Sequence, residues 1–223
     1  SPLPPASPIP LRLVGSEMCI RDRDDVGFNG VMYNLAPAGF GMKVVGRAIT
    51  VQETTGPFGS FSSDDFKVGH MIDAANPGDV IVVANNGAQV STWGGMASYA
   101  AKLKGVGGLV VDGGIRDREE IIEFSFPAFS RHMVPTPGKT RIKVLSINDP
   151  IVCAGVRVRK GDIIVADTDG VTVVPFDKID EVIKKLERII EVENAMDEKV
   201  SNGLKISQKA LDYLNSDQVV YYD

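Results

Sequence analysis

Histidine, cysteine and tryptophan are scarce in this chain. Its 223 residues include two histidines, two cysteines and one tryptophan. Cys19 and Cys153 are too few to build the disulfide framework of a small secreted protein, so we predict a cytoplasmic location, where thiols stay reduced. His70 and His132 are too few for a histidine-rich metal site, and we expect both to have structural roles.

A basic surface and a long apolar run are also missing. Lysine and arginine number 24 against 29 acidic residues, which gives a net charge of -5. A nucleic-acid-binding domain would carry a basic stripe, so we predict no nucleic-acid partner. No apolar run approaches the roughly 20 residues of a membrane-spanning helix, so we predict no membrane partner. The hydrophobic content of 43% is that of an ordinary globular protein, and the length suits one domain with a substantial core.

The most informative pattern lies between residues 79 and 112. Residues 79–84 are a β-branched run followed by Asn-Asn-Gly, which predicts a strand and then a glycine-rich loop. Apolar residues at helical spacing predict a helix that begins at Gly94 and ends at Gly105. Residues 108–112 predict a second buried strand, stopped by a pair of glycines. In a βαβ unit, both strands deliver their loops to the same edge of a parallel sheet, where ligands usually bind.

That edge would carry an anion-binding helix start and two charged side chains. The helix at Gly94 presents unpaired N–H groups and the positive end of its dipole. Arg116 can hold a carboxylate or enolate with two parallel hydrogen bonds, and Asp117 is a hard oxygen ligand of the kind that Mg²⁺ or Mn²⁺ prefers. Together they indicate chemistry on a small oxo acid. The alternative is that Gly94 and Asp117 only cap helices and that Arg116 is a solvated surface residue.

The remaining sequence combines alternating strands and helices with a later region dense in strands. This mixture predicts an α/β domain with two packed sheets and helices on one outer face. The additional predicted strands are residues 42–51, 126–133, 140–147, 151–158, 162–166 and 171–174, and the additional helices are residues 64–75, 118–123 and 178–202.

Four motifs in this order and spacing resemble one family, the regulator of ribonuclease activity A (RraA-like) family, which includes the 4-hydroxy-4-methyl-2-oxoglutarate (HMG/CHA) aldolases. The resemblance covers roughly residues 39–203. It implies an α/β fold that is a β/β/α sandwich of the swivelling phosphohistidine-domain type, with mixed parallel and antiparallel sheets. The motifs are PGDVIVV at residues 77–83, WGGMA at 93–97, VVDGGIRD at 110–117 and GVRVRKGDIIVADTDGVTVVP at 155–175.

The resemblance implies a metal-dependent (class II) aldolase or oxaloacetate decarboxylase that forms a pyruvate enolate. By resemblance, Asp117 binds the Mg²⁺ or Mn²⁺ cofactor, and Arg116 contacts the pyruvate oxygen and stabilises the enolate. The substrate carboxylate would be held by the backbone of Gly94, Gly95, Met96 and Ala97.

Family members form homotrimers, sometimes paired into hexamers, with sites between subunits. In the aldolases a glutamate of the long C-terminal helix reaches the neighbouring active site. Glu193 is the best match for this metal-site glutamate and Glu191 the next, although this charged segment could also be a solvated helix face.

One position departs from the aldolases. Where they carry an acid thought to help activate a water molecule, this chain has Gly95. Glycine cannot transfer a proton, so aldol cleavage should fall by ~10²-fold or more unless another carboxylate substitutes, whereas decarboxylation needs less proton handling. The alternative function is a non-catalytic RraA-like regulator that binds ribonuclease E.

Three segments are predicted along the chain. Residues 1–23 resemble a translated adaptor sequence or a disordered leader, residues 24–205 form the single RraA-like domain, and residues 206–223 form a C-terminal helix and tail.

Overall fold

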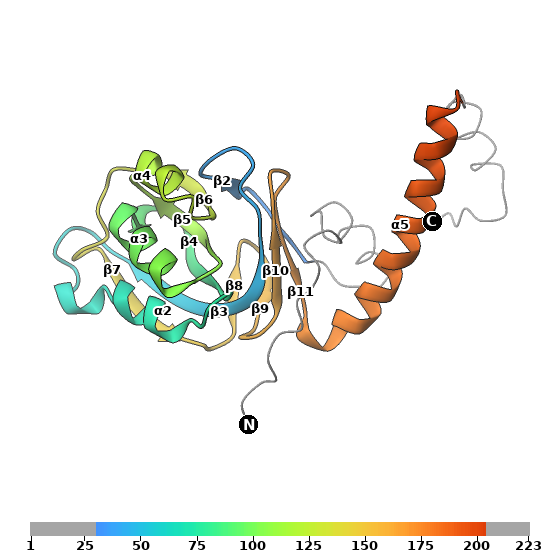
Figure 1. Cartoon of the computed structure of the whole chain (residues 1–223). Helices are drawn as coiled ribbons and strands as arrows, with labels where there is room; N and C mark the ends of the chain where they lie inside the picture. The colour runs from blue at the N-terminus through green and yellow to red at the C-terminus, as the bar shows by residue number, and fades with distance from the viewer. Residues whose placement is uncertain (1–29, 204–223) are drawn as a thin grey trace, which may run out of the picture.

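The computed structural model describes residues 30–203, so the predicted leader at 1–23 and tail at 206–223 lie outside the described residues. Four parallel strands form the middle of its large sheet, in the order β3-β4-β5-β6 (Figure 1). Their bounds are Val44–Thr55 for β3, Val80–Trp93 for β4, Gly108–Ile115 for β5 and Ala128–Met133 for β6.

Antiparallel strands extend this sheet at both sides. On one side β10 pairs with β3, β11 with β10 and β1 with β11, while β7 also pairs with β3 and β2 closes the far edge beside β6. The prediction of an α/β fold with mixed parallel and antiparallel pairing is therefore confirmed. The bounds are β1 Val31–Met32, β2 Ala36–Pro37, β7 Ile142–Ile147, β10 Ile163–Ala166 and β11 Val171–Val174, with a separate hairpin of β8 Ile151–Cys153 and β9 Val156–Val158.

The two faces of the sheet bury different cores, because side chains alternate along each strand. In β4, Ile81 and Val83 face the core shared with the helices, whereas Val82 and Ala84 face the core shared with the β8–β9 hairpin. The helices lie together on one side of the sheet in Figure 1, and the β8–β9 hairpin lies on the other. They are α2 Val68–Ala74, α3 Gly95–Lys104 and α4 Arg118–Glu123.

The last described element is α5, Ile179–Ser201, which follows a short 3-10 helix, η3, at Phe176–Lys178. Val182 and Leu186 of α5 pack against apolar residues of β10 and β11. The rest of the helix extends away from the body (Figure 1). Among the described residues, no helix is both long enough and apolar enough to cross a membrane.

The predicted carboxyl ends of the strands at residues 79–84 and 108–112 were wrong. β4 continues from residue 84 to Trp93, and β5 includes the glycine pair and ends at Ile115. The pairing of the two strands persists through three register shifts, for example at Ser91↔Gly114 and Trp93↔Ile115. A side chain at Gly114 would collide with the carbonyl of Val90, so the glycine marks a close approach of two strands rather than a turn.

Two other predicted elements are divided in the structure. The helix expected at 64–75 is a 3-10 helix, η2, at Ser63–Asp65 followed by α2, because the chain leaves helical geometry at Phe66. The strand expected at 151–158 is the β8–β9 hairpin, whose turn places both Ala154 and Gly155 at positive φ.

Candidate active site

Arg116 and Asp117 follow β5 directly and lie beside the amino end of α3. The Arg116 Nε atom is 3.3 Å from Asp117 Oδ2, and the same oxygen accepts a 3.0 Å hydrogen bond from the backbone N–H of Gly95. Asp117 takes the left-handed conformation, with φ 57° and ψ 46°, and its side chain makes no cap to its own helix α4. This uncommon backbone geometry turns the carboxylate back toward α3.

The amino end of α3 is shaped to admit these two side chains. A Cβ atom at Gly94 would lie 3.2 Å from Arg116 Nε and closer still to Asp117 Oδ2, so no larger residue fits at 94 without displacing the pair. Buried hydrogen bonds hold this helix start, since Trp93 Nε1 donates to Ser98 Oγ at 2.9 Å and Ser98 Oγ donates to the Gly94 carbonyl at 3.1 Å.

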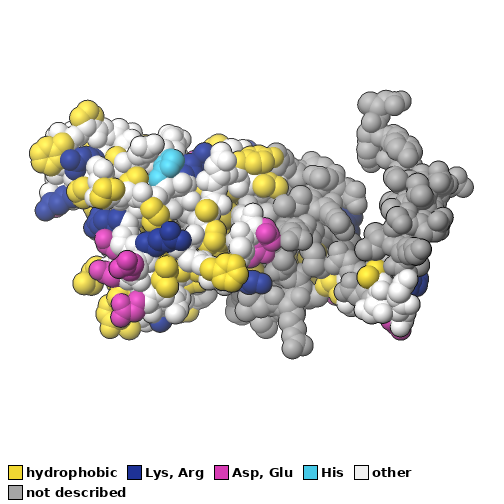
Figure 2. All heavy atoms as spheres, turned by 90° about the horizontal axis from the view of Figure 1, so that it is seen from above, with side chains coloured by type: hydrophobic (Ala, Val, Ile, Leu, Met, Phe, Trp, Pro, Cys, Tyr) yellow, Lys and Arg dark blue, Asp and Glu magenta, His cyan; other side chains and the backbone are white. Residues whose placement is uncertain are grey.

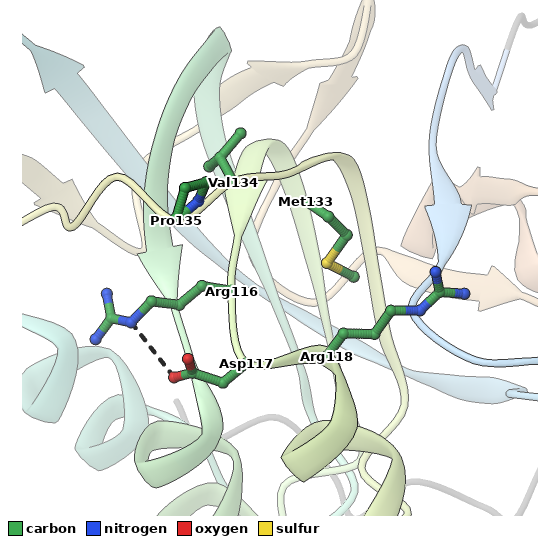
Figure 3. A pocket seen from close by; sticks show the side chains of 6 residues that line it. All are labelled: Arg116, Asp117, Arg118, Met133, Val134 and Pro135. Atoms are coloured by element: carbon green, nitrogen blue, oxygen red, sulfur yellow. Dashed lines mark ion pairs between the residues drawn. The ribbon is translucent and has the colours of Figure 1, made fainter.

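A pocket opens beside the pair, on the side of the end of β6 and the segment that follows it (Figure 3). Its volume is about 340 Å³, which suits a small organic acid. The Arg118 guanidinium points away from Arg116 and donates a 2.5 Å hydrogen bond to the Ala38 carbonyl (Figure 3). The lining residues are Arg116, Asp117, Arg118, Met133, Val134 and Pro135.

The site is open to solvent and carries charges of both signs. The side chains of Arg116 and Asp117 are 36% and 38% exposed, so their ion pair is weak and can be rearranged by a ligand. Basic and acidic side chains lie close together on the face of the body shown in Figure 2. The first turn of α3 contains no acidic residue, so its positive end is not neutralised within the helix.

The structure brings together most of the predicted site residues. Gly94, Gly95, Arg116 and Asp117 meet at one edge of the sheet. The Gly95 amide is already engaged by Asp117, which leaves the amides of Met96 and Ala97 in the first turn as the donors for a substrate carboxylate. Glu193 lies on α5, but its side chain is outside the described residues.

A buried acid beneath the site was missed by sequence reasoning. Glu53 is 1% exposed, and its Oε2 accepts a 2.6 Å hydrogen bond from Thr92 Oγ1, two residues before Gly94. Asn85 Nδ2 donates to the same hydroxyl at 3.2 Å. Burial raises the pKa of Glu53 to about 8, and the Thr92 hydrogen bond only partly opposes this. The strand predicted at residues 42–51 stops short of Glu53, whereas the structure continues β3 to Thr55, so the sequence pattern did not indicate this acid.

The other polar groups near this edge have structural partners. Asp112 is buried, forms an ion pair with Arg131 of β6, and accepts a 2.8 Å hydrogen bond from the Ala154 amide. It therefore ties β5 and β6 to the β8–β9 hairpin. His132 lies 3.2 Å from the Gly87 carbonyl, and His70 is exposed on α2.

The donor set fits a hydrated hard cation better than a fully protein-coordinated ion. Among the described residues, no group of three or more histidine, cysteine, aspartate or glutamate side chains could hold a metal. Asp117 engages Gly95 and Arg116 through Oδ2, and no hydrogen bond described for residues 30–203 uses its Oδ1. One free carboxylate oxygen with room for water is the arrangement in which Mg²⁺ is often bound.

Comparisons with known proteins point to one family. The profile of the RraA-like family, described as Aldolase/RraA, matches residues 20–173. An uncharacterized protein of Methanocaldococcus jannaschii is 36% identical over 72% of this chain and 74% of its own length. A Halalkalibacterium halodurans protein named "Putative 4-hydroxy-4-methyl-2-oxoglutarate aldolase" is 34% identical over 83% of this chain and 85% of its own length.

A solved structure is similar over most of the chain. It is Streptomyces coelicolor RraAS2, described as an unusual member of the RNase ES inhibitor RraA protein family. The TM-score is 0.76 at 26% identity, and the match covers 83% of this chain and 93% of the other.

Proposed function

Because this chain belongs to the RraA-like (Aldolase/RraA) family, we propose that it is a metal-dependent lyase that cleaves a carbon–carbon bond of a small oxo acid and leaves a pyruvate enolate. Its substrates would be of the 4-hydroxy-4-methyl-2-oxoglutarate type, of the oxaloacetate type, or both. The observation that carries the proposal is the meeting of Arg116, Asp117 and the amino end of α3 beside one pocket.

Each of these groups suits a different part of an oxo acid. The amides of Met96 and Ala97, at the positive end of α3, would bind the substrate carboxylate. The Arg116 guanidinium would donate hydrogen bonds to the 2-oxo oxygen and stabilise the negative charge that grows there when the carbon–carbon bond breaks. Because half-exposed charges lose part of their strength to solvent, a bound substrate that excludes water would strengthen this interaction.

Asp117 would hold the divalent cation, through Oδ1 and ordered water. When bound, Mg²⁺ or Mn²⁺ supplies a Lewis acid for the 2-oxo group. The hydrogen bond from Gly95 and the ion pair with Arg116 fix the orientation of the Asp117 carboxylate. Side chains that bind metals are commonly oriented by such hydrogen bonds from neighbouring residues.

The test measures pyruvate release from oxaloacetate and from 4-hydroxy-4-methyl-2-oxoglutarate with Mg²⁺ or Mn²⁺. We expect Asp117→Asn to lower kcat/KM by ~10²-fold or more, because the neutral amide is a poor ligand for a hard cation. The control is Asp73→Asn, an exposed aspartate of α2. If the wild type turns over neither compound, or if Asp117→Asn matches Asp73→Asn, the proposal is wrong.

A second candidate function is regulation of a ribonuclease of the RNase E type. It is favoured by the similarity to RraAS2 and by the exposed apolar side chains of Met96 and Leu103 on α3, which could contact a protein partner. A binding assay with ribonuclease E distinguishes the two functions. A complex that Met96→Lys weakens, without pyruvate release from either compound, would favour regulation.

We also infer the assembly and the finer fold type from the family. In a homotrimer or hexamer, α5 of one subunit would bring Glu193 to the metal of its neighbour, which agrees with the extension of α5 away from its own body (Figure 1). The helices on one face of the sheet and strands on the other suit the swivelling phosphohistidine-domain type.

A further inference from the structure

Gly95 makes room for a carboxylate that comes from another helix. A Cβ atom at residue 95 would lie 2.6 Å from Glu120 Cδ and closer still to Glu120 Oε2, well inside the 3.0 Å that real Cβ contacts keep. The carboxyl group of Glu120 therefore occupies the space that any larger side chain at 95 would enter. Although α3 has no acid in its first turn, an acid lies there all the same.

The packing of α3 against α4 fixes the backbone from which Glu120 projects. Tyr99 of α3 and Phe124 of α4 bring their ring centroids to 5.1 Å, and Lys102 Nζ donates a 2.5 Å hydrogen bond to the Phe124 carbonyl. Ile121, the neighbour of Glu120, is fully buried in the core beneath the helices. Glu120 thus projects from a short helix that contacts α3 at both ends, through Phe124 at one and through the hydrogen bond between Gly95 and Asp117 at the other.

Three other acids near the site already have partners. Asp117 Oδ2 is engaged by Gly95 and Arg116, and Asp112 by Arg131 and the Ala154 amide. Glu53 is buried against Thr92. In the described part of the chain, by contrast, no hydrogen bond or ion pair engages the exposed Glu120 carboxylate, so its oxygens are available to a bound substrate.

We propose that Glu120 is the proton-transferring residue of the aldol reaction, a role that rests on the proposed function. Its carboxylate takes the proton of the substrate's C4 hydroxyl as the C3–C4 bond breaks. The hydroxyl oxygen becomes the carbonyl of one pyruvate, and the electron pair of the broken bond becomes the enolate of the other. Glu120 then returns its proton to C3 of that enolate, which completes two pyruvates without another reactant.

The experiment compares two reactions in the same variant, with Mg²⁺ present. Oxaloacetate loses CO₂ without the removal of a hydroxyl proton, so a proton-transfer role affects the two substrates unequally. We expect Glu120→Gln to lower kcat for 4-hydroxy-4-methyl-2-oxoglutarate by ~10²-fold and kcat for oxaloacetate by less than ~5-fold. The control is Glu119→Gln, the exposed neighbour on the same helix.

The outcomes separate the two proposals. A wild type inactive on both substrates overturns the lyase function and this role with it. A wild type active on both, with Glu120→Gln equal to Glu119→Gln or with equal losses on the two substrates, overturns only the role of Glu120.

Discussion

The buried acid Glu53 should make the stability of this protein depend on pH, and Glu53→Gln should remove that dependence. Glu53 is 1% exposed, and burial raises its pKa from 4.5 to about 8. Between these two values the folded state keeps the proton while the unfolded state has lost it. The contribution of Glu53 to stability is therefore fully present below pH 4.5 and is lost as the pH rises to about 8.

The size of the effect follows from the two pKa values. Each pH unit in which only one of the two states holds the proton changes the free energy of unfolding by about 1.4 kcal/mol. From pH 5 to pH 8 the wild type should therefore lose roughly 3 to 4 kcal/mol relative to Glu53→Gln, as an upper estimate, because water entry and local relaxation reduce the cost of a buried charge. The glutamine keeps the length of the side chain and an oxygen for Thr92 Oγ1.

Urea unfolding at pH 5 and pH 8, at one protein concentration, measures the difference. The control is Val51→Ala, which removes apolar volume from the same strand without a titratable group and should lower stability equally at both pH values. If the stability difference between wild type and Glu53→Gln is the same at pH 5 and pH 8, then Glu53 is not a buried neutral acid and the reasoning is refuted.

Two further predictions concern the site and its support. Gly94→Ala should reduce pyruvate release by ~10-fold or more with little change in Tm, because the new methyl group would displace the Arg116–Asp117 pair rather than core side chains; an unchanged kcat/KM would contradict this. Asp112→Asn should lower the free energy of unfolding in urea by roughly 2 to 4 kcal/mol, because it leaves Arg131 without its ionised partner; a loss below about 0.5 kcal/mol would show that the ion pair contributes little.

The local sequence pattern was sufficient to predict the strands and the helix that position the site. The β-branched runs that begin β4 and β5 are found where they were expected, and so is α3 between Gly94 and Gly105. From these the parallel arrangement followed, since a strand, a helix and a second strand return to the same sheet edge. The proximity of Arg116 to the start of α3 could thus be predicted without coordinates.

Strand continuation and hairpin formation could not be predicted in this way. Residues 85–92 contain Asn-Asn-Gly, a turn signal by local propensity, yet they remain in β4 because β5 pairs with this segment at Ala88 and Ser91. Residues 151–158 have the composition of one strand, and only the return of the chain at Ala154 divides them. Strand pairing decided both cases, with β5 for residues 85–92 and within the segment itself for residues 151–158.

The sequence by itself determined the mixed α/β class, the family motifs and the order of charged residues after β5. Only the tertiary structure decided which acids lie near Arg116, Asp117 and the start of α3. Glu53 reaches Thr92 from a neighbouring strand, and Glu120 enters the space left by Gly95 from a neighbouring helix. Glu53 and Thr92 are 39 positions apart in the sequence, and Gly95 and Glu120 are 25 apart. Helix and strand periodicity relates only residues a few positions apart, so these contacts depend on how the helices and strands pack in three dimensions.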